Sequence, residues 1–183
     1  MQKTVFRLHL PEWRDYEAVT REVVAALNLG TSLVHLTGAR GERLLLSGIE
    51  GNWHASIRID GNAGTEFCRA MNSPNLVVYL NGDCGSGPGF GLKSGTVVIG
   101  GKAGALVGSQ IEGGQIWCLG PAGPRLAHRS RGGMIVVGNA LGPLAMDRRI
   151  SGTLRIQRYP NESAEATAIR DRINQMMQPA GDN

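Results

Sequence analysis

The stretch GTVVIGGKAG at residues 95–104 returns 19 residues later as GQIWCLGPAG at residues 114–123, and after another 19 residues as GMIVVGNALG at residues 133–142. Each copy opens with a glycine, continues with a short β-prone run, and closes with small residues at fixed spacing. A constant period in a sequence is typical of repeat architectures, in which every copy packs on the copies beside it. The repeat therefore predicts a solenoid.

Glycine columns extend the repeat in both directions. A pair of glycines separated by two residues recurs at Gly61/Gly64, Gly82/Gly85, Gly101/Gly104 and Gly120/Gly123, with steps of 21, 19 and 19 residues. In the next copy Gly142 keeps the second site, and Asn139 takes the first. A second column follows the same phase at Gly95, Gly114, Gly133 and Gly152. The 27 glycines of the 183 residues are thus concentrated at recurring positions, where we expect the chain to turn.

Alternation within the β-prone runs predicts which side chains face inward. Two columns are apolar: Ile57, Val78, Val97, Ile116, Ile135 and Leu154, and then Ile59, Leu80, Ile99, Cys118, Val137 and Ile156. The column between them is mixed: Arg58, Tyr79, Val98, Trp117, Val136 and Arg155. Successive side chains of a strand point to opposite faces. We therefore expect the two apolar columns in the core and the mixed column on the outer surface.

The period selects the fold class. A βαβ unit needs about 30 residues, and hairpins would not keep every strand at one phase of the repeat. The sequence predicts a mainly β protein, a right-handed parallel β-helix with coils of about 19 residues. A glycine-rich β-sandwich with accidental spacing is the alternative. We expect a single domain over residues 1–183, with a cap over 1–30, the β-helix over 31–158 and a helix over 161–178.

Both ends of the chain carry helical patterns. Residues Asp15–Asn28 place apolar side chains on one face and are followed by Gly30, and Ser163–Gln178 shows a similar pattern. Residues Leu33–Leu36 and Arg43–Leu46 are expected to form short strands on either side of a turn, GARGE. Since natural proteins cover exposed strand edges, we expect the two helices to cap the ends of the solenoid.

The sequence offers no complete catalytic motif. GSGPGFG lacks the third glycine of a dinucleotide loop, and in GGKAG an alanine follows Lys102, so a P-loop is not formed. The histidines His9, His35, His54 and His128 show no metal-ligand spacing, and none lies in a pattern with a cysteine or a carboxylate that suggests a nucleophile and a base. We expect no catalytic, cofactor-binding or metal-binding residues, and no cofactor.

Composition and cysteine usage bear on location. No apolar run reaches about 18 residues, and the first residues lack the apolar core of a signal peptide. The three cysteines, Cys68, Cys84 and Cys118, are widely spaced and are expected to be reduced thiols. The sequence predicts a cytoplasmic protein with no membrane partner.

One segment is strongly basic. Between Gly113 and Asn161 there are seven arginines, and Asp147 is the one acidic residue. Arg129 and Arg148 are 19 residues apart, so they should stack on adjacent coils, where like charges repel. We therefore expect an acidic partner or a polyanionic ligand there; a solvated, solubilising face is the alternative. The candidate partner-binding residues are Arg125, Arg129, Arg131, Arg148, Arg149 and Trp117. Nucleic acid is not expected, because aromatic residues are only 5% of the chain.

Three segments resemble known families. GSGPGFGLKSGTVVIGGKAG, residues 85–104, resembles the GXGXG β-helix domain at the C-terminus of the large subunit of glutamate synthase, with Gly87, Gly89 and Gly91 at the name-giving positions. AALNLGTSLVHLTGARGERLLLSGIEG is similar to the lead-in of stand-alone subunits of that type, including those of N-methylglutamate synthase. RSRGGMIVVGNALGPLAMDRRISGTLRI resembles the β-helix subunit of formylmethanofuran dehydrogenase and its counterpart in the bacterial formyltransferase/hydrolase complex. The resemblance covers residues 20–157.

The resemblance implies a function without catalytic residues. In these families the β-helix is a scaffold between catalytic parts, so this chain is expected to be a non-catalytic structural subunit of an oxidoreductase-type or amidotransferase-type complex in nitrogen or one-carbon metabolism. The sequence departs from the pattern at Ala127, His128 and Arg149, where late repeats of these families commonly have Met and Gly, and it is shorter than the formylmethanofuran-type subunit. The alternatives are a free-standing β-helix enzyme or sugar-binding protein, and a homo-oligomer that binds an anionic ligand and associates through Val98, Trp117 and Val136.

Overall fold

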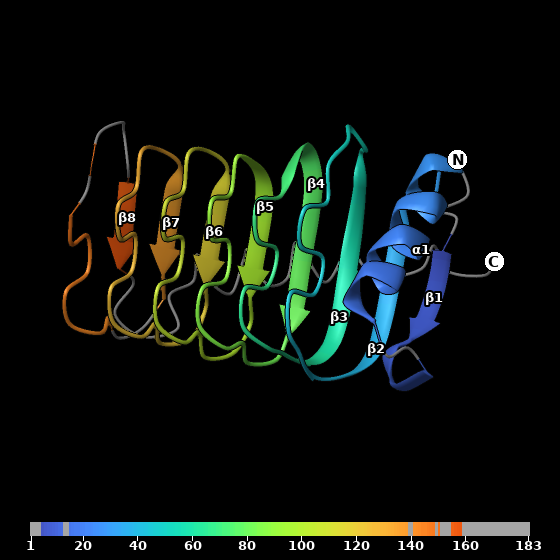
Figure 1. Cartoon of the computed structure of the whole chain (residues 1–183), viewed down its shortest axis with the longest axis horizontal. Helices are drawn as coiled ribbons and strands as arrows, with labels where there is room; N and C mark the ends of the chain where they lie inside the picture. Colours follow the sequence, from blue (N-terminus) through green and yellow to red (C-terminus); the bar gives the residue numbers. More distant parts are fainter. Residues whose placement is uncertain (1–4, 13–14, 139–140, 149, 151–154, 159–183) are drawn as a thin grey trace.

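The computed structural model describes residues 5–12, 15–138, 141–148, 150 and 155–158 (Figure 1). Within them the chain is mainly β: eight strands form one parallel sheet in the order β1 to β8, so each strand pairs with the next one along the chain. Parallel neighbours require a complete coil of chain between them. The predicted fold, a parallel β-solenoid, is confirmed. The elements are β1 Val5–His9, η1 Leu10–Glu12, α1 Tyr16–Asn28, β2 Leu33–Glu42, β3 Ala55–Ala63, β4 Asn72–Asn81, β5 Ser94–Ile99, β6 Gln115–Cys118, β7 Met134–Val137 and β8 Arg155–Arg158.

The strand register reproduces the sequence period. Val78, Val97, Ile116 and Ile135 are successive partners, 19 positions apart. The first coils are longer, since Ile57 pairs with Val78, 21 positions on, and Val34 pairs with Ile57, 23 positions on. From β3 to β7 both predicted inward columns are buried. Like residues therefore stack on like residues in one aliphatic core, as the repeat predicts.

The mixed column does not form the exposed surface that alternation predicts. Tyr79, Val98 and Val136 keep only 4%, 1% and 2% of their surface exposed, and Trp117 is half-buried. A second apolar cluster contains Tyr79 and Val98 together with Leu33. Alternation assigns a side chain to a face of the sheet, but it does not tell whether that face is covered. The expectation of an exposed stripe is therefore wrong for Val98 and Val136, which are buried.

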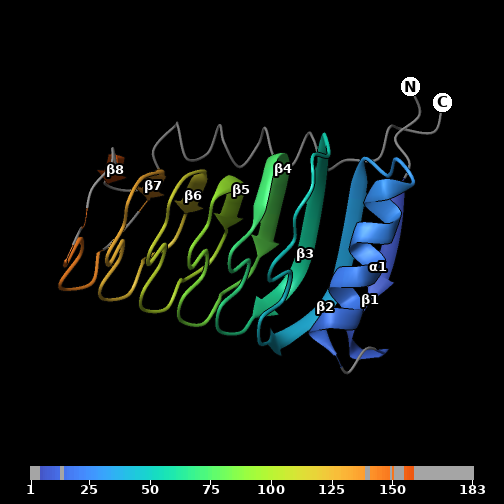
Figure 2. The ribbon, with the colours of Figure 1, turned by 45° about the horizontal axis from the view of Figure 1, so that its top comes forward.

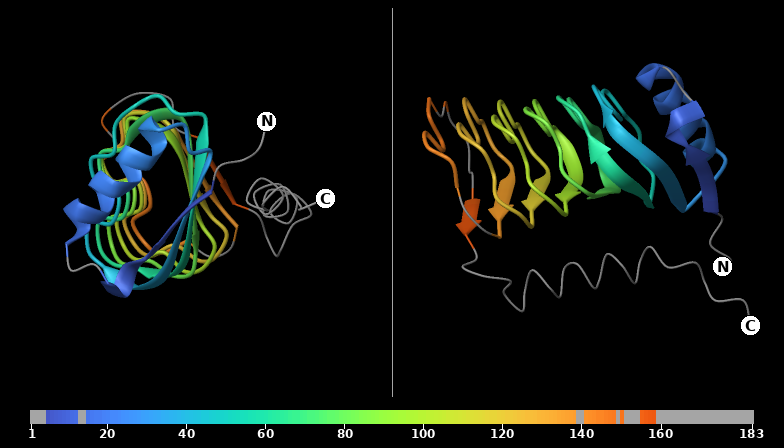
Figure 3. Two further views of the ribbon diagram at one scale, coloured as in Figure 1. Left: turned by 90° about the vertical axis from the view of Figure 1, so that its right-hand side faces the viewer. Right: turned by 90° about the horizontal axis from the view of Figure 1, so that it is seen from below.

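Between β2 and β8, each coil also contains a five-residue segment in which every second residue has positive φ, on the opposite side of the solenoid from the strands (Figure 3). In these left-handed arcs the first, third and fifth residues have positive φ; the arcs are residues 44–48, 66–70, 87–91, 106–110, 125–129 and 144–148. Gly87, Gly89 and Gly91 occupy the three positions of one arc, with φ of 76°, 64° and 62°. Glycine adopts this conformation without steric cost, which explains the GXGXG spacing physically.

The first arc corrects a predicted strand. Residues Arg43–Leu46 are not extended, because Leu44 and Leu46 have φ of 60° and 57°. The expected turn, GARGE, lies instead inside β2, which continues to Glu42. A short apolar run is compatible with a strand and with an arc, because both conformations bury apolar side chains against the core. Only the stacking of this segment on the arcs of later coils distinguishes the two.

The N-terminal end of the solenoid is capped as expected. Helix α1 packs across the first strands and buries Val19, Val23 and Leu27 (Figure 2). The Asp15 side chain caps the helix by accepting a hydrogen bond from the amide of Glu17 at 2.9 Å. The helix expected over Ser163–Gln178 lies outside the described residues. In the part of the chain that the structure covers, no helix has the length and hydropathy needed to span a bilayer.

Candidate functional site

The predicted partner-binding residues fall into three places. Arg125 and Arg129 lie at the first and fifth positions of one arc, and Arg148 lies at the fifth position of the next, directly stacked on Arg129. Arg131 forms an ion pair with Glu112 at 3.6 Å. Trp117 belongs to β6, on the sheet side, and its Nε1 donates to Gln115 Oε1 at 3.2 Å. Arg149 lies outside the described residues. The structure thus gathers three of the six.

These three arginines carry uncompensated charge. Arg125, Arg129 and Arg148 are exposed, and no carboxylate among the described residues lies within 4.0 Å of their guanidinium groups. The nearby acid, Asp147, faces His128 instead, with Oδ2 3.6 Å from Nδ1. Since charges on adjacent coils are about 5 Å apart, the arginines raise one another's electrostatic energy. A negative partner would relieve this repulsion.

Backbone hydrogen bonds join the arcs in a regular ladder. The amides of the first and fifth residues donate to the following arc: Leu106 to Pro124 O and Gln110 to His128 O, both at 2.8 Å. The amide of the third residue donates to the preceding arc, as Met146 does to Leu126 O at 2.7 Å. In the last arc, the equivalent amides of Leu144 and Arg148 meet no further arc within the described part of the chain. Within the described residues, these two amides are an unpaired edge of the ladder.

Apolar side chains surround that edge. Met146 occupies an arc position that is buried in earlier coils, as Cys68 and Ala127 show, yet it is 36% exposed. Leu144 and Ile150 are 58% and 56% exposed. Helix α1 lies at the opposite end of the solenoid, beside β1 and β2 (Figure 1). We define the C-terminal end surface as Leu144, Met146, Ile150, Arg125, Arg129 and Arg148.

A second polar group lies on the outer face of the first strands, and the sequence did not predict it. The Asp60 carboxylate accepts hydrogen bonds from His35 Nε2 at 2.6 Å, Arg58 Nε at 2.9 Å and Asn81 Nδ2 at 3.1 Å. Partial burial pushes the pKa of Asp60 upward, but the donors His35, Asn81 and Arg58 outweigh it, so this pKa lies below its ordinary value.

The structure brings His35 and Asp60 into contact, although no sequence pattern joins a histidine to a carboxylate as a nucleophile and base. His35 and Asp60 are 25 residues apart, a separation that matches none of the motifs sought in the sequence. They meet because the coil between β2 and β3 has 23 residues, which places Arg58 opposite His35 and Asp60 two positions further. The first coils depart from the 19-residue period, so only the observed register brings these groups together.

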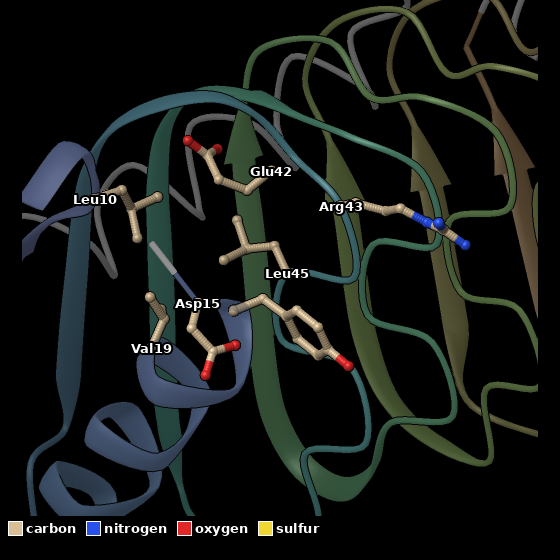
Figure 4. Close-up of a pocket in the computed structure, with 7 residues that line it drawn as sticks. Leu10, Asp15, Val19, Glu42, Arg43 and Leu45 are labelled. Atoms are coloured by element: carbon tan, nitrogen blue, oxygen red, sulfur yellow. The ribbon is translucent and has the colours of Figure 1, made fainter. Parts of the chain in front are cut away.

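A cavity of about 240 Å³ lies between the start of α1 and the first arc (Figure 4). Its polar lining serves the fold. Asp15 caps the helix, and the Glu42 carboxylate accepts hydrogen bonds from the amide of Arg40, at 3.1 and 2.8 Å to its two oxygens. The Arg43 side chain points away from the other lining residues in Figure 4. Among the described residues the cavity has no free polar groups converging on its centre, and we assign it no role.

The three cysteines are buried free thiols. Burial raises the pKa of Cys84 to about 12 and raises the pKa values of Cys68 and Cys118 as well. Because the thiolate is the nucleophile and the metal ligand, burial keeps these side chains in their less reactive form. Among the described residues, no three His, Cys, Asp or Glu side chains are grouped to hold a metal ion.

Comparison with protein-family models, with curated proteins and with solved structures gives no match. The assignment of a parallel β-solenoid rests on the pairing of β1 to β8 alone.

Proposed function

We propose that this chain is a non-catalytic scaffolding subunit of a multi-subunit enzyme complex, and that it binds a partner protein through the C-terminal end surface. One observation carries the proposal: the last arc leaves Leu144 and Ile150 more than half exposed beside three arginines without a carboxylate partner in the described chain. The opposite end of the same solenoid is covered by α1.

Three contributions would stabilise a partner on the C-terminal end surface. Exposed apolar side chains that cluster on a surface are typical of interaction sites, and burying each one fully contributes about 1.5–3 kcal/mol. Unpaired amides at the edge of a ladder provide hydrogen-bond donors for an added segment of chain. Arginine is enriched in protein interfaces and complements acidic surfaces. A partner with apolar and acidic groups would satisfy all three.

Electrostatics favours a different protein over a second copy of this chain. If two copies met at their C-terminal end surfaces, Arg125, Arg129 and Arg148 of each would face the same arginines of the other, and like charges across an interface cost several kcal/mol. A head-to-tail arrangement would place this surface against α1, which already covers the first coil. We therefore expect a partner of different sequence and opposite charge.

The family resemblance supports a complex of the glutamate synthase or formylmethanofuran dehydrogenase type. The GXGXG spacing at Gly87, Gly89 and Gly91 resembles that of the glutamate synthase domain, in which a β-helix lies between catalytic parts. We place the protein in a cytoplasmic complex of the glutamate synthase or formylmethanofuran dehydrogenase type. The first would handle nitrogen transfer and the second one-carbon transfer.

A polyanionic ligand is the second candidate for the same surface. The place of Arg129 and Arg148 at the same position of adjacent arcs favours it, because guanidinium groups on neighbouring coils suit a chain of carboxylates such as an oligoglutamate. This function needs no protein partner. Binding of an oligoglutamate peptide to the isolated protein, measured by calorimetry, distinguishes it from the scaffold.

The test is co-purification of the tagged protein from its own cells at low salt, with the bound proteins identified by mass spectrometry. We expect stoichiometric recovery of a catalytic subunit, and loss of that subunit in the double variant Arg129→Glu/Arg148→Glu. The control, Arg40→Glu/Arg43→Glu, makes the same change of charge at exposed positions near the other end. Recovery of the partner with the Arg129→Glu/Arg148→Glu variant, or of the wild-type chain alone, would refute the proposal.

A further inference from the structure

A column of basic side chains crosses the outer face of the first three strands. Arg7 of β1, His35 of β2 and Arg58 of β3 are register partners. Neighbouring strands are about 4.8 Å apart, so the three side chains leave the sheet close together. Arg7 is exposed, while His35 and Arg58 are half-buried. This column is at the opposite end of the sheet from the C-terminal end surface, and neither the scaffold function nor the fold accounts for it.

A single carboxylate holds part of the column in place. Asp60 accepts from His35 Nε2 and from Arg58 Nε, which fixes the imidazole ring and the guanidinium group. Within the described residues the Arg58 Nη groups and the whole Arg7 side chain take part in no hydrogen bond or ion pair. Two guanidinium groups thus share one negative charge, and an excess of positive charge and of N–H donors is left.

We propose that Arg7, His35 and Arg58 form a binding site for a small oxyanion, either a carboxylate or a phosphate. Guanidinium groups bind both anions through two parallel N–H donors, and they are strongest where solvent is partly excluded, as it is around Arg58. His35 contributes through Asp60, whose carboxylate accepts from its Nε2 and also from Arg58 Nε. Asp60 keeps the half-buried groups oriented, so of the three side chains the anion would have to order only that of Arg7 on binding.

Substitution of Arg7 distinguishes a binding site from a purely structural network. Arg58 and His35 contribute to the fold through Asp60, and their replacement changes internal hydrogen bonds. Arg7 makes no such bond with the described residues, so within that part of the chain its charge has no partner. The variant Arg7→Gln therefore removes the ligand contact and leaves the network of Asp60 intact.

The experiment is isothermal titration calorimetry of the purified full chain with two probes, inorganic phosphate and glutarate, at constant ionic strength. We expect saturable binding of at least one probe and a loss of affinity of about tenfold in Arg7→Gln. Arg58→Gln should weaken binding as well. The control Arg21→Gln removes an exposed arginine on α1 whose ion pairs are only 4.0 Å contacts, and it should bind as the wild type does.

The two probes identify the anion class, and each result decides the proposal. Binding of phosphate alone, of glutarate alone or of both, with loss in Arg7→Gln, supports the site and names its ligand. Absence of saturable binding with either probe, or an unchanged affinity in Arg7→Gln, overturns it. The result is independent of the partner at the C-terminal end surface, because Arg7 and Arg129 lie at opposite ends of the solenoid.

Discussion

The backbone amide of Arg129 donates a hydrogen bond to the carbonyl of Asp147 at 3.2 Å, and this bond joins the last two arcs of the described chain. The same bond links Gln110 to His128 one coil earlier. Arg148 stands at the next step of the ladder, where the described chain provides no further carbonyl. Amides that are unpaired within the described residues, together with exposed apolar side chains and exposed arginines, form a surface suited to a partner.

Two glycines illustrate different reasons for glycine in the repeat: the close approach of two coils at Gly104, and the positive φ at Gly91. A Cβ on Gly104 would lie 2.7 Å from the carbonyl carbon of Gly85 and 2.8 Å from the amide nitrogen of Ser86, so Gly104→Ala must force two coils apart. We expect this variant to lose about 3 kcal/mol of unfolding free energy in urea denaturation. Gly91 has φ of 62° with no atom within 4 Å of a Cβ, so Gly91→Ala should lose about 1 kcal/mol. Equal losses of unfolding free energy in the two variants would contradict the distinction between close packing at Gly104 and positive φ at Gly91.

The carboxylate of Asp60 should make stability depend on pH. Its pKa in the folded protein lies below the ordinary value of 3.8, so its contribution is present above that pH and is lost as pH falls through the folded value. At neutral pH we expect Asp60→Asn to lower the unfolding free energy by about 2 kcal/mol, because charged hydrogen bonds weaken. Urea denaturation from pH 7 downward should show the difference between wild type and variant shrinking below pH 3.8. A difference in unfolding free energy between wild type and Asp60→Asn that grows as the pH falls would contradict a lowered pKa of Asp60.

Burial should protect all three thiols in the native state. Because the pKa of Cys84 is raised to about 12 and those of Cys68 and Cys118 are also raised, little thiolate forms at mildly alkaline pH. We expect no rapid reaction of the native protein with Ellman's reagent, and reaction of all three cysteines once the protein is unfolded. A thiol that reacts at once in the native protein would place that cysteine in contact with solvent.

The sequence predicted the features that depend on the period. Stacked columns such as Val78, Val97 and Ile116 follow directly from the 19-residue spacing, and helix α1 follows from its apolar face and from the Gly30 after it. These features are local or strictly repeated, so the order of residues is sufficient to find them.

Features that depend on strand register, or on whether a face of the sheet is covered, could not be predicted from the sequence. The contact between His35 and Asp60 requires the length of one irregular coil, and the burial of Val98 depends on what lies over the sheet. The segment Arg43–Leu46, which was expected to be a strand, is an arc. The sequence did not indicate this, because a leucine with positive φ cannot be told from a leucine in a strand by its sequence alone. Of the predicted partner-binding residues, Arg129 and Arg148 were placed together by period alone, whereas Trp117 was not separated from them.

The most direct test of the account is the mass of the complex purified from the protein's own cells, measured by native mass spectrometry for wild type, Leu144→Glu/Ile150→Glu and Leu29→Glu. The double variant adds charge at the C-terminal end surface, and Leu29, 88% exposed after α1, is a matched apolar position at the other end. We predict a hetero-complex for wild type and Leu29→Glu, and the free chain with unchanged stability for the double variant. A hetero-complex that persists in the double variant would contradict the proposed docking surface, and a wild-type chain without any partner would contradict the scaffold itself.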